Sequence, residues 1–292
     1  MADKTKFLSD IQSESADTRF AAWRAAGEQS ADVIPDLAKI ASSRNPGMRK
    51  AALEAMTTLT HSVGKDAMNS KRAGVSAALV GVATGSSYQE PVRAQALRLV
   101  SLIGSDDVIP LLLKLFASPE LREEAIYAVE RIPGDAASKA IASAYAAAPD
   151  DFKPRILAAL GHRRAAEGVP LAAAAMKSAN REIAAAGAKA YGRIGKASAG
   201  ARFPAGEWDS RLRFADAQVA AGNHAEAMPH FKAALEAPEE HLQCAGIVGI
   251  AKMDTAEGAS TIFPKLKSSN RKVRITAEQA WKRMASTVPP KG

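Results

Sequence analysis

The stretch VRAQALRLVSLIGSDDVIPLL, residues 92–112, decides the fold of this chain. Its first half carries apolar residues at the spacing of one helical face: Val92, Ala96, Leu99, Val100 and Ile103. Its second half contains Pro110, and the first turn of a helix tolerates proline because the missing N–H would have no intrahelical partner there. The stretch therefore predicts a helix, a tight turn and a second helix.

This helix pair recurs along the chain. It starts with an apolar residue, usually an arginine, two further residues and a small residue, and copies begin at 18, 48, 92, 121, 154, 183, 212, 242 and 273. One step between copies is 44 residues long and the others span 29 to 33, a regularity that chance does not easily produce. A self-similar unit of this length is typical of stacked repeats.

The second half of the unit recurs as well. In four copies a proline follows the arginine position by 15 to 17 residues: Pro35, Pro110, Pro170 and Pro229. We expect a second helix to begin at each of them. Four glycines fall between the two helices, where we expect a backbone with positive φ: Gly27, Gly104, Gly161 and Gly222.

The boundaries between units also match. Residues 177–181 read KSANR and residues 267–271 read KSSNR, with a looser version, SSRN, at 42–45. Serine and asparagine favour helix N-caps, so these turns predict the start of the next helix. The recurrent arginine that follows is a long donor, and we expect its guanidinium to reach a carboxylate or a carbonyl of a neighbouring unit.

This pattern resembles the HEAT-like repeat family, in particular its short version named after phycobilisome lyases, over about residues 15–286. Residues 212–236 also resemble one tetratricopeptide hairpin, through Gly222, Ala227, Phe231 and Ala234. The resemblance implies an all-α fold, an α-solenoid of about nine stacked helix pairs with roughly seventeen to nineteen helices and no strand pairs. It says little about function, because the family serves many tasks.

The repeat divides the chain into five segments. Residues 1–14 form an N-terminal cap, 15–195 hold regular repeats, 196–209 break the pattern, 210–286 resume it with a basic C-terminal end, and 287–292 form a tail. The break contains two glycines and a proline, which disfavour a helix, so we expect a bend or a subdomain boundary there, with the lowest local stability. An extra segment, 61–74, fills the 44-residue step and predicts a longer loop or an added turn.

The sequence shows no catalytic or metal-binding motif. The five histidines lack the spacing of a metal site, and neither a phosphate-binding loop nor a nucleophile elbow occurs. The one cysteine, Cys244, occupies an apolar helical position, where we expect a buried and inert thiol. We therefore expect no enzyme activity, no cofactor and no metal.

One enzyme class stays open as an alternative. HEAT-like alkylpurine DNA glycosylases combine a basic concave face with tryptophan and a carboxylate. Trp208 and Asp209 lie in the irregular segment and offer such a pair, whereas Trp23 and Trp281 fit apolar helix faces and predict core packing. Nucleic-acid binding, with or without base repair, is thus the second candidate function.

The charge of the chain gathers at its C-terminal end. The formal net charge is +8, of which residues 261–292 carry +7 and the first 260 residues only +1. The candidate binding residues of this end are Lys265, Lys267, Arg271, Lys272, Arg274, Lys282 and Arg283. Either they contact an anionic partner, or they form a polar cap that keeps the last repeat soluble.

Lysines also recur in the second helices, which line the concave side of such a stack. Besides Lys39 and Lys265, these are Lys114, Lys139, Lys177 and Lys232. If they align, the groove suits an acidic partner, and otherwise they are ordinary solvated positions. The function that the sequence favours is a non-catalytic scaffold that binds a protein with an acidic surface.

The sequence bears on location too. No signal peptide is visible, no apolar run reaches the roughly 18 residues of a membrane span, and a single cysteine fits a reducing compartment. We expect a soluble, cytoplasmic protein without a membrane partner. The oligomeric state and the identity of the partner stay open.

Overall fold

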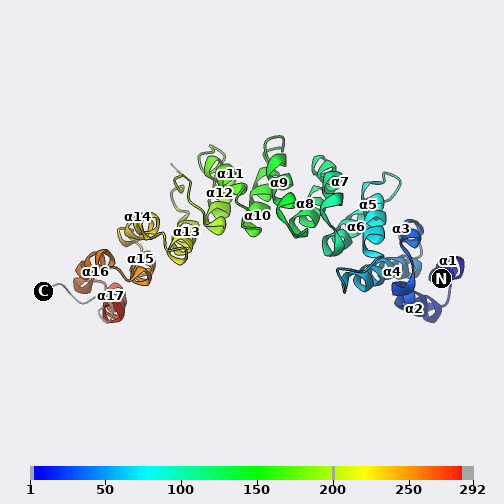
Figure 1. Ribbon diagram of the computed structural model, residues 1–292, viewed down its shortest axis with the longest axis horizontal. Coiled ribbons are helices and arrows are strands. Elements are labelled where there is room, and N and C mark those ends of the chain that lie inside the picture. Colours follow the sequence, from blue (N-terminus) through cyan, green and yellow to red (C-terminus); the bar gives the residue numbers. More distant parts are fainter. Residues whose placement is uncertain (1–2, 199–200, 285–292) are drawn as a thin grey trace. The chain divides into compact units, whose positions relative to one another are not determined.

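The computed structural model describes residues 3–198 and 201–284. Within these ranges the regular structure consists of seventeen α-helices and five short 3-10 helices, without a strand (Figure 1). The predicted all-α class is confirmed for this part of the chain. None of these helices combines the length and the hydropathy that a membrane span requires. The chain divides into two compact units, Met1–Pro149 and Asp150–Gly292.

The first unit is built from two layers of helices. One layer holds α2 (Ala16–Arg24), α4 (Pro46–Gly64), α6 (Glu90–Ile103) and α8 (Arg122–Arg131), which pack one after another. The other holds α3 (Ile34–Ile40), α5 (Arg72–Thr84), α7 (Ile109–Lys114) and α9 (Asp135–Ala144), again in succession. The first layer begins with α1 (Lys4–Ile11), which packs on α2. The apolar face predicted for α6 is buried, with Ala96 and Val100 fully inside.

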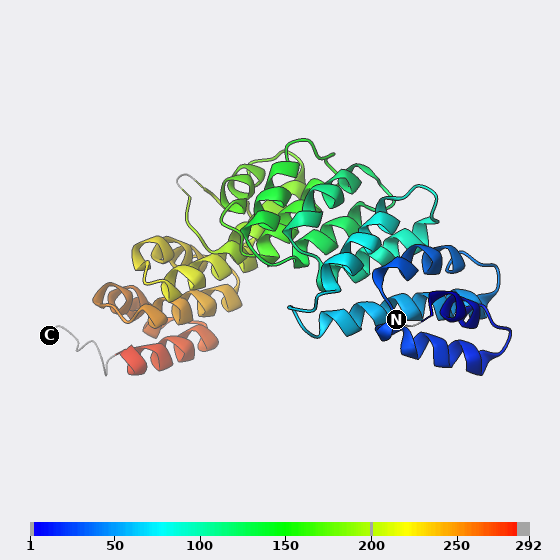
Figure 2. The same ribbon diagram turned by 45° about the vertical axis from the view of Figure 1, so that its right-hand side comes forward.

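The second unit has a similar construction. One layer holds α10 (Lys153–His162), α12 (Arg181–Ile194), α13 (Trp208–Ala220), α15 (Glu240–Met253) and α17 (Arg271–Met284), which pack in succession. The other layer holds α11 (Gly168–Ala175), α14 (His224–Leu235) and α16 (Ala256–Ile262), and each of these contacts two helices of the first layer. Figure 2 shows the succession from α13 to α17 from a second side.

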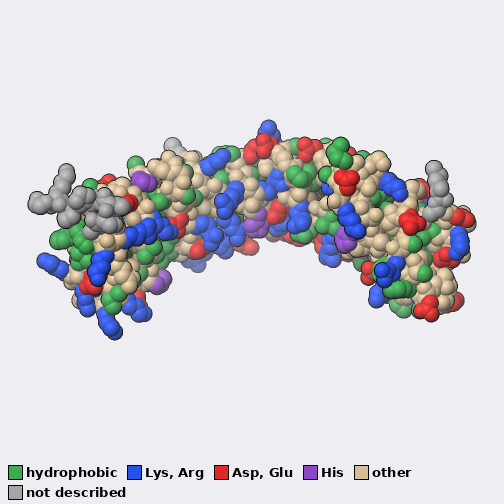
Figure 3. All heavy atoms as spheres, turned by 60° about the horizontal axis from the view of Figure 1, so that its bottom comes forward, with side chains coloured by type: hydrophobic (Ala, Val, Ile, Leu, Met, Phe, Trp, Pro, Cys, Tyr) green, Lys and Arg blue, Asp and Glu red, His purple; other side chains and the backbone are tan. Residues whose placement is uncertain are grey.

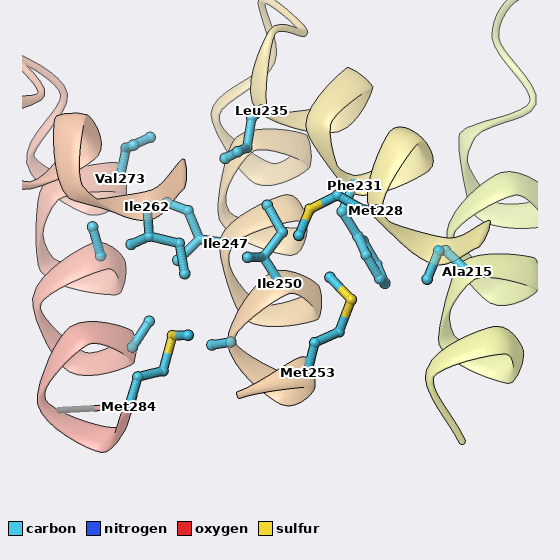
Figure 4. Close-up of a cluster of buried hydrophobic side chains, with 14 residues drawn as sticks. Ala215, Met228, Phe231, Leu235, Ile247, Ile250, Met253, Ile262, Val273 and Met284 are labelled. Carbon is cyan, nitrogen blue, oxygen red and sulfur yellow. The ribbon is translucent and has the colours of Figure 1, made fainter. Parts of the chain in front are cut away.

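The core between α13 and α17 shows how neighbouring pairs adhere. Phe231 of α14 and Ile250 of α15 are buried in one cluster, and Ile262 of α16 and Val273 of α17 continue it (Figure 4). Burying such a side chain stabilises the fold by about 1.5–3 kcal/mol. The same cluster thus runs through two consecutive helix pairs and the last helix, α17, and these helices depend on one another for a complete core.

The repeated turns fold as the sequence predicts. Asn45, Asn180 and Asn270 each accept hydrogen bonds from the backbone N–H groups two and three residues later, at 2.9 to 3.4 Å. The hydroxyl of the serine two residues before each asparagine accepts from the asparagine N–H at 3.1 to 3.3 Å. The predicted asparagine N-caps are confirmed.

The recurrent arginine holds such turns closed. Arg19, Arg49 and Arg274 donate to the carbonyl oxygen six residues earlier, at 2.5, 3.2 and 2.7 Å. Arg93 instead reaches the carbonyl oxygen of Ala83 in α5, at 2.8 Å. The acceptor is a carbonyl, as expected. For Arg19, Arg49 and Arg274, however, this carbonyl lies in the turn that enters the same helix rather than in a neighbouring unit. We call this i to i−6 contact the arginine clamp.

The proline rule holds for three of its four copies. Pro35, Pro110 and Pro170 lie in the first turns of α3, α7 and α11. The prediction is wrong for Pro229, which lies inside α14, because that helix already begins at His224.

The expectation of positive φ at four glycines is wrong for three of them. Only Gly222 has a positive φ, of 77°. Gly161 lies within α10, where an added Cβ would come within 3.0 Å of Ala190 Cα in α12. Glycine serves there to bring two helices together, which the sequence pattern did not distinguish from a turn.

Half of the extra segment, residues 61–74, is helical, and its other half forms the longer loop that the sequence predicts. α4 continues to Gly64 and α5 begins at Arg72, so only residues 65–71 connect the two helices. Lys71 ties this connection to the turn before α3, because its ammonium group donates to the carbonyl oxygens of Glu28 and Gln29, at 3.0 and 3.2 Å.

The segment that connects α12 to α13, residues 195–207, contains no helix among its described residues. The N–H of Ser198 donates to the Tyr191 hydroxyl at 2.7 Å, which ties the start of the segment to α12. Trp208 and Asp209 were expected in this irregular segment, but they form the first turn of α13.

Candidate interaction surfaces

Three cations of the C-terminal end already have partners within the second unit. Lys272 donates to the Glu240 carboxylate of α15 at 2.5 Å, and Lys265 donates to the carbonyl oxygen of Leu235 at 3.0 Å. Arg274 forms an arginine clamp. The hydrogen bond from Lys272 lowers the pKa of Glu240, and the same bond raises the pKa of Lys272. These three candidates are therefore already engaged within the second unit.

The remaining candidates of this end are directed at solvent. Lys267, Arg271 and Lys282 are exposed, and their side chains have no ion pair or hydrogen bond within the described ranges. Arg283 is exposed on the same helix, and Lys291 lies outside the described residues. Since only Glu278 opposes these cations locally, the surface of α17 stays strongly basic.

The apolar stripe of α17 faces the preceding helices. Val273, Ala277 and Met284 are buried, and the half-buried Trp281 ring lies 5.4 Å from the Phe263 ring. The sequence predicted core packing for this tryptophan, but it is only half-buried and lies against the exposed Phe263 ring.

Trp208 and Asp209 are both engaged on α13 itself. The Arg211 guanidinium lies over the Trp208 ring, 5.1 Å from its centroid, and Asp209 forms an ion pair with Arg213 at 3.3 Å. A tryptophan covered by its own neighbour is a poor platform for an extruded base. The pair therefore gives no support to the glycosylase alternative.

The lysines of the second helices are divided between the two units. Lys39, Lys114 and Lys139 belong to the first unit, and Lys177, Lys232 and Lys265 to the second. Lys232 forms an ion pair with Glu257 of α16 at 2.9 Å, and Lys39 one with Asp36 at 3.3 Å. Lys177 lies in the turn between α11 and α12, not in the second helix itself. The exposed side chains of Lys114 and Lys139 have no ion-pair partner among the described residues.

The two units differ completely in charge. Residues 1–149 hold seventeen Lys and Arg and seventeen Asp and Glu, a net charge of zero. Residues 150–292 hold twenty-two against fourteen, a net charge of +8. Counting from the C-terminal end alone missed a second basic segment, 150–198, with nine basic and four acidic residues. Figure 3 shows Lys and Arg side chains gathered over α10 and α12 and again over α17.

An aromatic cluster joins the connecting segment to α12, α13 and α14. The Phe203 ring lies 5.6 Å from Tyr191, 5.8 Å from Phe214 and 5.7 Å from His230. Arg211 donates its Nε–H to His230 Nδ1 at 3.2 Å, which requires a neutral imidazole. Burial lowers the pKa of His230 to about 4, and the positive charge of Arg211 adds to this effect. No sequence pattern indicates this cluster, because its members are spread over forty residues.

The described ranges contain the cysteine and the kinds of side chain that could bind a metal ion. Cys244 is half-buried rather than buried, and its sulfur accepts a hydrogen bond from Thr276 at 3.4 Å. Three or more His, Cys, Asp or Glu side chains arranged to hold a metal ion do not occur in residues 3–198 and 201–284.

No protein-family model and no curated protein matches the chain. Solved structures do align with it. One crystal structure of an engineered protein is 18% identical, covers 97% of this chain and 99% of its own, and gives a TM-score of 0.35. A second engineered protein is 19% identical, covers 98% of each chain and gives a TM-score of 0.24. Scores this low do not establish a common fold or a common function.

Proposed function

We propose that this chain is an α-solenoid of about nine stacked helix pairs that acts as a non-catalytic scaffold and binds an acidic protein through its second unit. The layered packing within each unit supports the architecture, because successive helices contact one another and one core cluster runs from α13 to α17. Stacked pairs of this kind offer extended surfaces suited to macromolecular partners.

The observation that carries the function is the uneven charge. Both units have helix pairs of the same kind, and a net charge anywhere on the chain would serve solubility. All eight excess positive charges nevertheless lie in residues 150–292. A polar cap accounts for charge at the last repeat but not for the excess of cations in residues 150–198, and an anionic partner accounts for both.

The test is charge reversal on the full chain. The variant K267E/R271E/K282E changes only cations without structural contacts, and R44E/K50E/K65E is the matched control, since these exposed cations of the first unit also lack ion pairs in the described ranges. The probe is a fluorescein-labelled glutamate-rich peptide, whose binding is followed by anisotropy at low and at physiological salt. We expect the first variant to bind about two- to threefold more weakly and the control to change by less than about 1.5-fold.

Two outcomes contradict the proposal. Equal losses in both variants would show that the peptide senses only net charge. Tighter binding of a duplex DNA oligomer than of the peptide, with affinity falling steeply as salt rises, would establish the nucleic-acid alternative instead. Circular dichroism of both variants confirms that helical content is unchanged.

A further inference from the structure

α12 presents a line of cations to solvent. Lys189 and Arg193 are four residues apart, hence one turn apart on the same face, and Lys196 follows just beyond the end of the helix. All three side chains are exposed, and within the described ranges none has an ion pair or a hydrogen bond. None of them belongs to the basic end or to the lysines of the second helices.

A fourth cation, Arg164, lies in the turn that follows α10. The end of α10 lies beside α12, because Gly161 of α10 packs against Ala190, and Gly168, the first residue of α11, packs against Ile194 at the end of α12. Arg164 is exposed and has a positive φ of 49°, a conformation that costs a non-glycine residue about 1–2 kcal/mol. Glycine would relieve this strain, so arginine here does not serve the stability of the turn.

The attraction between a cation and a helix dipole explains only some of the exposed cations of α12. A cation in the last turn of a helix gains about 0.3–1 kcal/mol, which applies to Arg193. Lys189 lies in the middle of α12 and gains nothing of the kind. Arg181 is the first residue of α12, where the dipole opposes a cation, and it is exposed without an ion pair among the described residues.

The charge pattern of the second unit restricts the partner. Residues 150–198 carry +5, residues 201–260 carry −4, and residues 261–292 carry +7. The middle stretch stays negative even when Glu236 and Glu240 are counted as neutralised by Lys265 and Lys272. A long continuous polyanion laid along this unit would meet repulsion at its centre, whereas a short acidic segment fits on α12 alone.

The surface between the cations also favours a short acidic peptide as the partner. Ala185 and Ala186 of α12 are half-buried and small, which leaves a shallow apolar floor beside the charges. The one aromatic residue of α12, Tyr191, is buried and offers no face for stacking a base. Such a surface suits carboxylates with a few apolar side chains better than a nucleic-acid strand.

We propose that the exposed face of α12, with Lys189, Arg193, Lys196 and Arg164, is a docking site for a short acidic polypeptide segment. The segment binds through carboxylates placed along the helix. From Arg181 to Arg193 the helix is about 18 Å long, which an extended peptide covers with about six residues. This inference rests on the proposed function and assigns to it a surface separate from α17.

The test uses the full chain and three variants with the same change of charge. K189E/R193E/K196E alters the α12 face, K267E/R271E/K282E alters α17, and R44E/K50E/K65E is the control in the first unit. The probe is a fluorescein-labelled peptide of about eight residues, mostly glutamate with two leucines. We expect the α12 variant to weaken its binding about tenfold or more, the α17 variant about two- to threefold, and the control less than about 1.5-fold.

The outcomes separate this inference from the function on which it rests. Binding lost in the α17 variant but kept in the α12 variant overturns the α12 site and leaves the scaffold function standing. Binding of neither the peptide nor a longer acidic protein to the native chain overturns both. Tighter binding of duplex DNA, lost in the α12 variant, overturns the choice of partner.

A single substitution checks that the effect is not one of folding. Arg164→Gly removes one charge and the backbone strain together. We expect the melting temperature to stay the same or rise while the peptide binds about two- to threefold more weakly. Unchanged binding in this variant would remove Arg164 from the site.

Discussion

The two units of this chain share a construction and differ in what they expose. Both stack helix pairs in two layers, and both use the asparagine-capped turn and the arginine clamp. The first unit is electrically neutral and the second carries +8. The repeat therefore determines the buried positions, while the exposed positions vary freely. For a chain of this kind the repeat indicates the fold, and the departures from it on the surface indicate the function.

Glycine use separates the units a second time. In α12, Gly192 packs directly against the backbone of α13, and an added Cβ would clash with the carbonyl oxygen of Ser210. In α5, Gly81 has nothing within 4 Å of an added Cβ. Gly192 of the second unit thus allows close backbone contact between two helices. The helical Gly81 of the first unit is exposed and faces open space.

The largest expected effect follows from this contrast. Gly192→Ala should lower the free energy of unfolding by about 2–3 kcal/mol, because a backbone oxygen cannot move aside as a flexible side chain can. Gly81→Ala, the matched control, should raise it by about 0.5–1 kcal/mol through helix propensity alone. Urea denaturation followed by circular dichroism measures both, and similar effects of the two substitutions would remove the distinction between the units.

The aromatic cluster around the connecting segment makes the second unit sensitive to acid. His230 has a folded pKa of about 4, below its ordinary value of 6.5, so the fold favours the neutral imidazole. Its contribution to stability is complete above pH 6.5 and is lost as the pH falls towards 4. The side chain is only partly buried, so we expect a loss of about 1–2 kcal/mol after allowance for solvent screening.

The variant His230→Gln isolates this effect. Glutamine can still accept a hydrogen bond from Arg211, but it does not titrate. The difference in unfolding free energy between pH 7 and pH 4.5 should therefore be smaller in the variant than in the native chain by about 1 kcal/mol. An identical difference in both proteins would show that other groups alone set the acid sensitivity.

The sequence predicts the helix pairs well because their signals are local. Asn180 and Asn270 cap their helices, and Val273 and Ala277 are buried, all at the spacing that the pattern gives. The structural roles of glycine and proline were predicted less well, for a physical reason. Gly161 serves helix contact and Pro229 lies inside α14, and neither role differs in sequence from a turn.

The candidate site was only partly predictable because ion pairs join distant residues. The count of cations in residues 261–292 is correct, but Glu236 and Glu240 precede that segment and engage Lys265 and Lys272. The face of α12 was missed for the opposite reason. Its cations are diluted by alanines in the sequence, and only the helix brings Lys189 and Arg193 to the same side.

The arginine clamp gives the smallest expected effect and compares the two units in one contact. Arg274 in the second unit is partly buried and donates to Ser268 at 2.7 Å, whereas Arg49 in the first is exposed and donates to Ser43 at 3.2 Å. A charged donor gains more from a carbonyl where water is excluded, so Arg274→Ala should cost about 1–1.5 kcal/mol and Arg49→Ala about 0.5 kcal/mol. Lys50→Ala, next to Arg49 and without a partner among the described residues, is the control and should be nearly neutral. The order of the three values is the decisive result: if Arg49→Ala costs as much as Arg274→Ala, burial is not what gives the clamp its strength. The recurrence of arginine would then reflect the geometry of the turn alone, equal in the neutral unit and in the basic one.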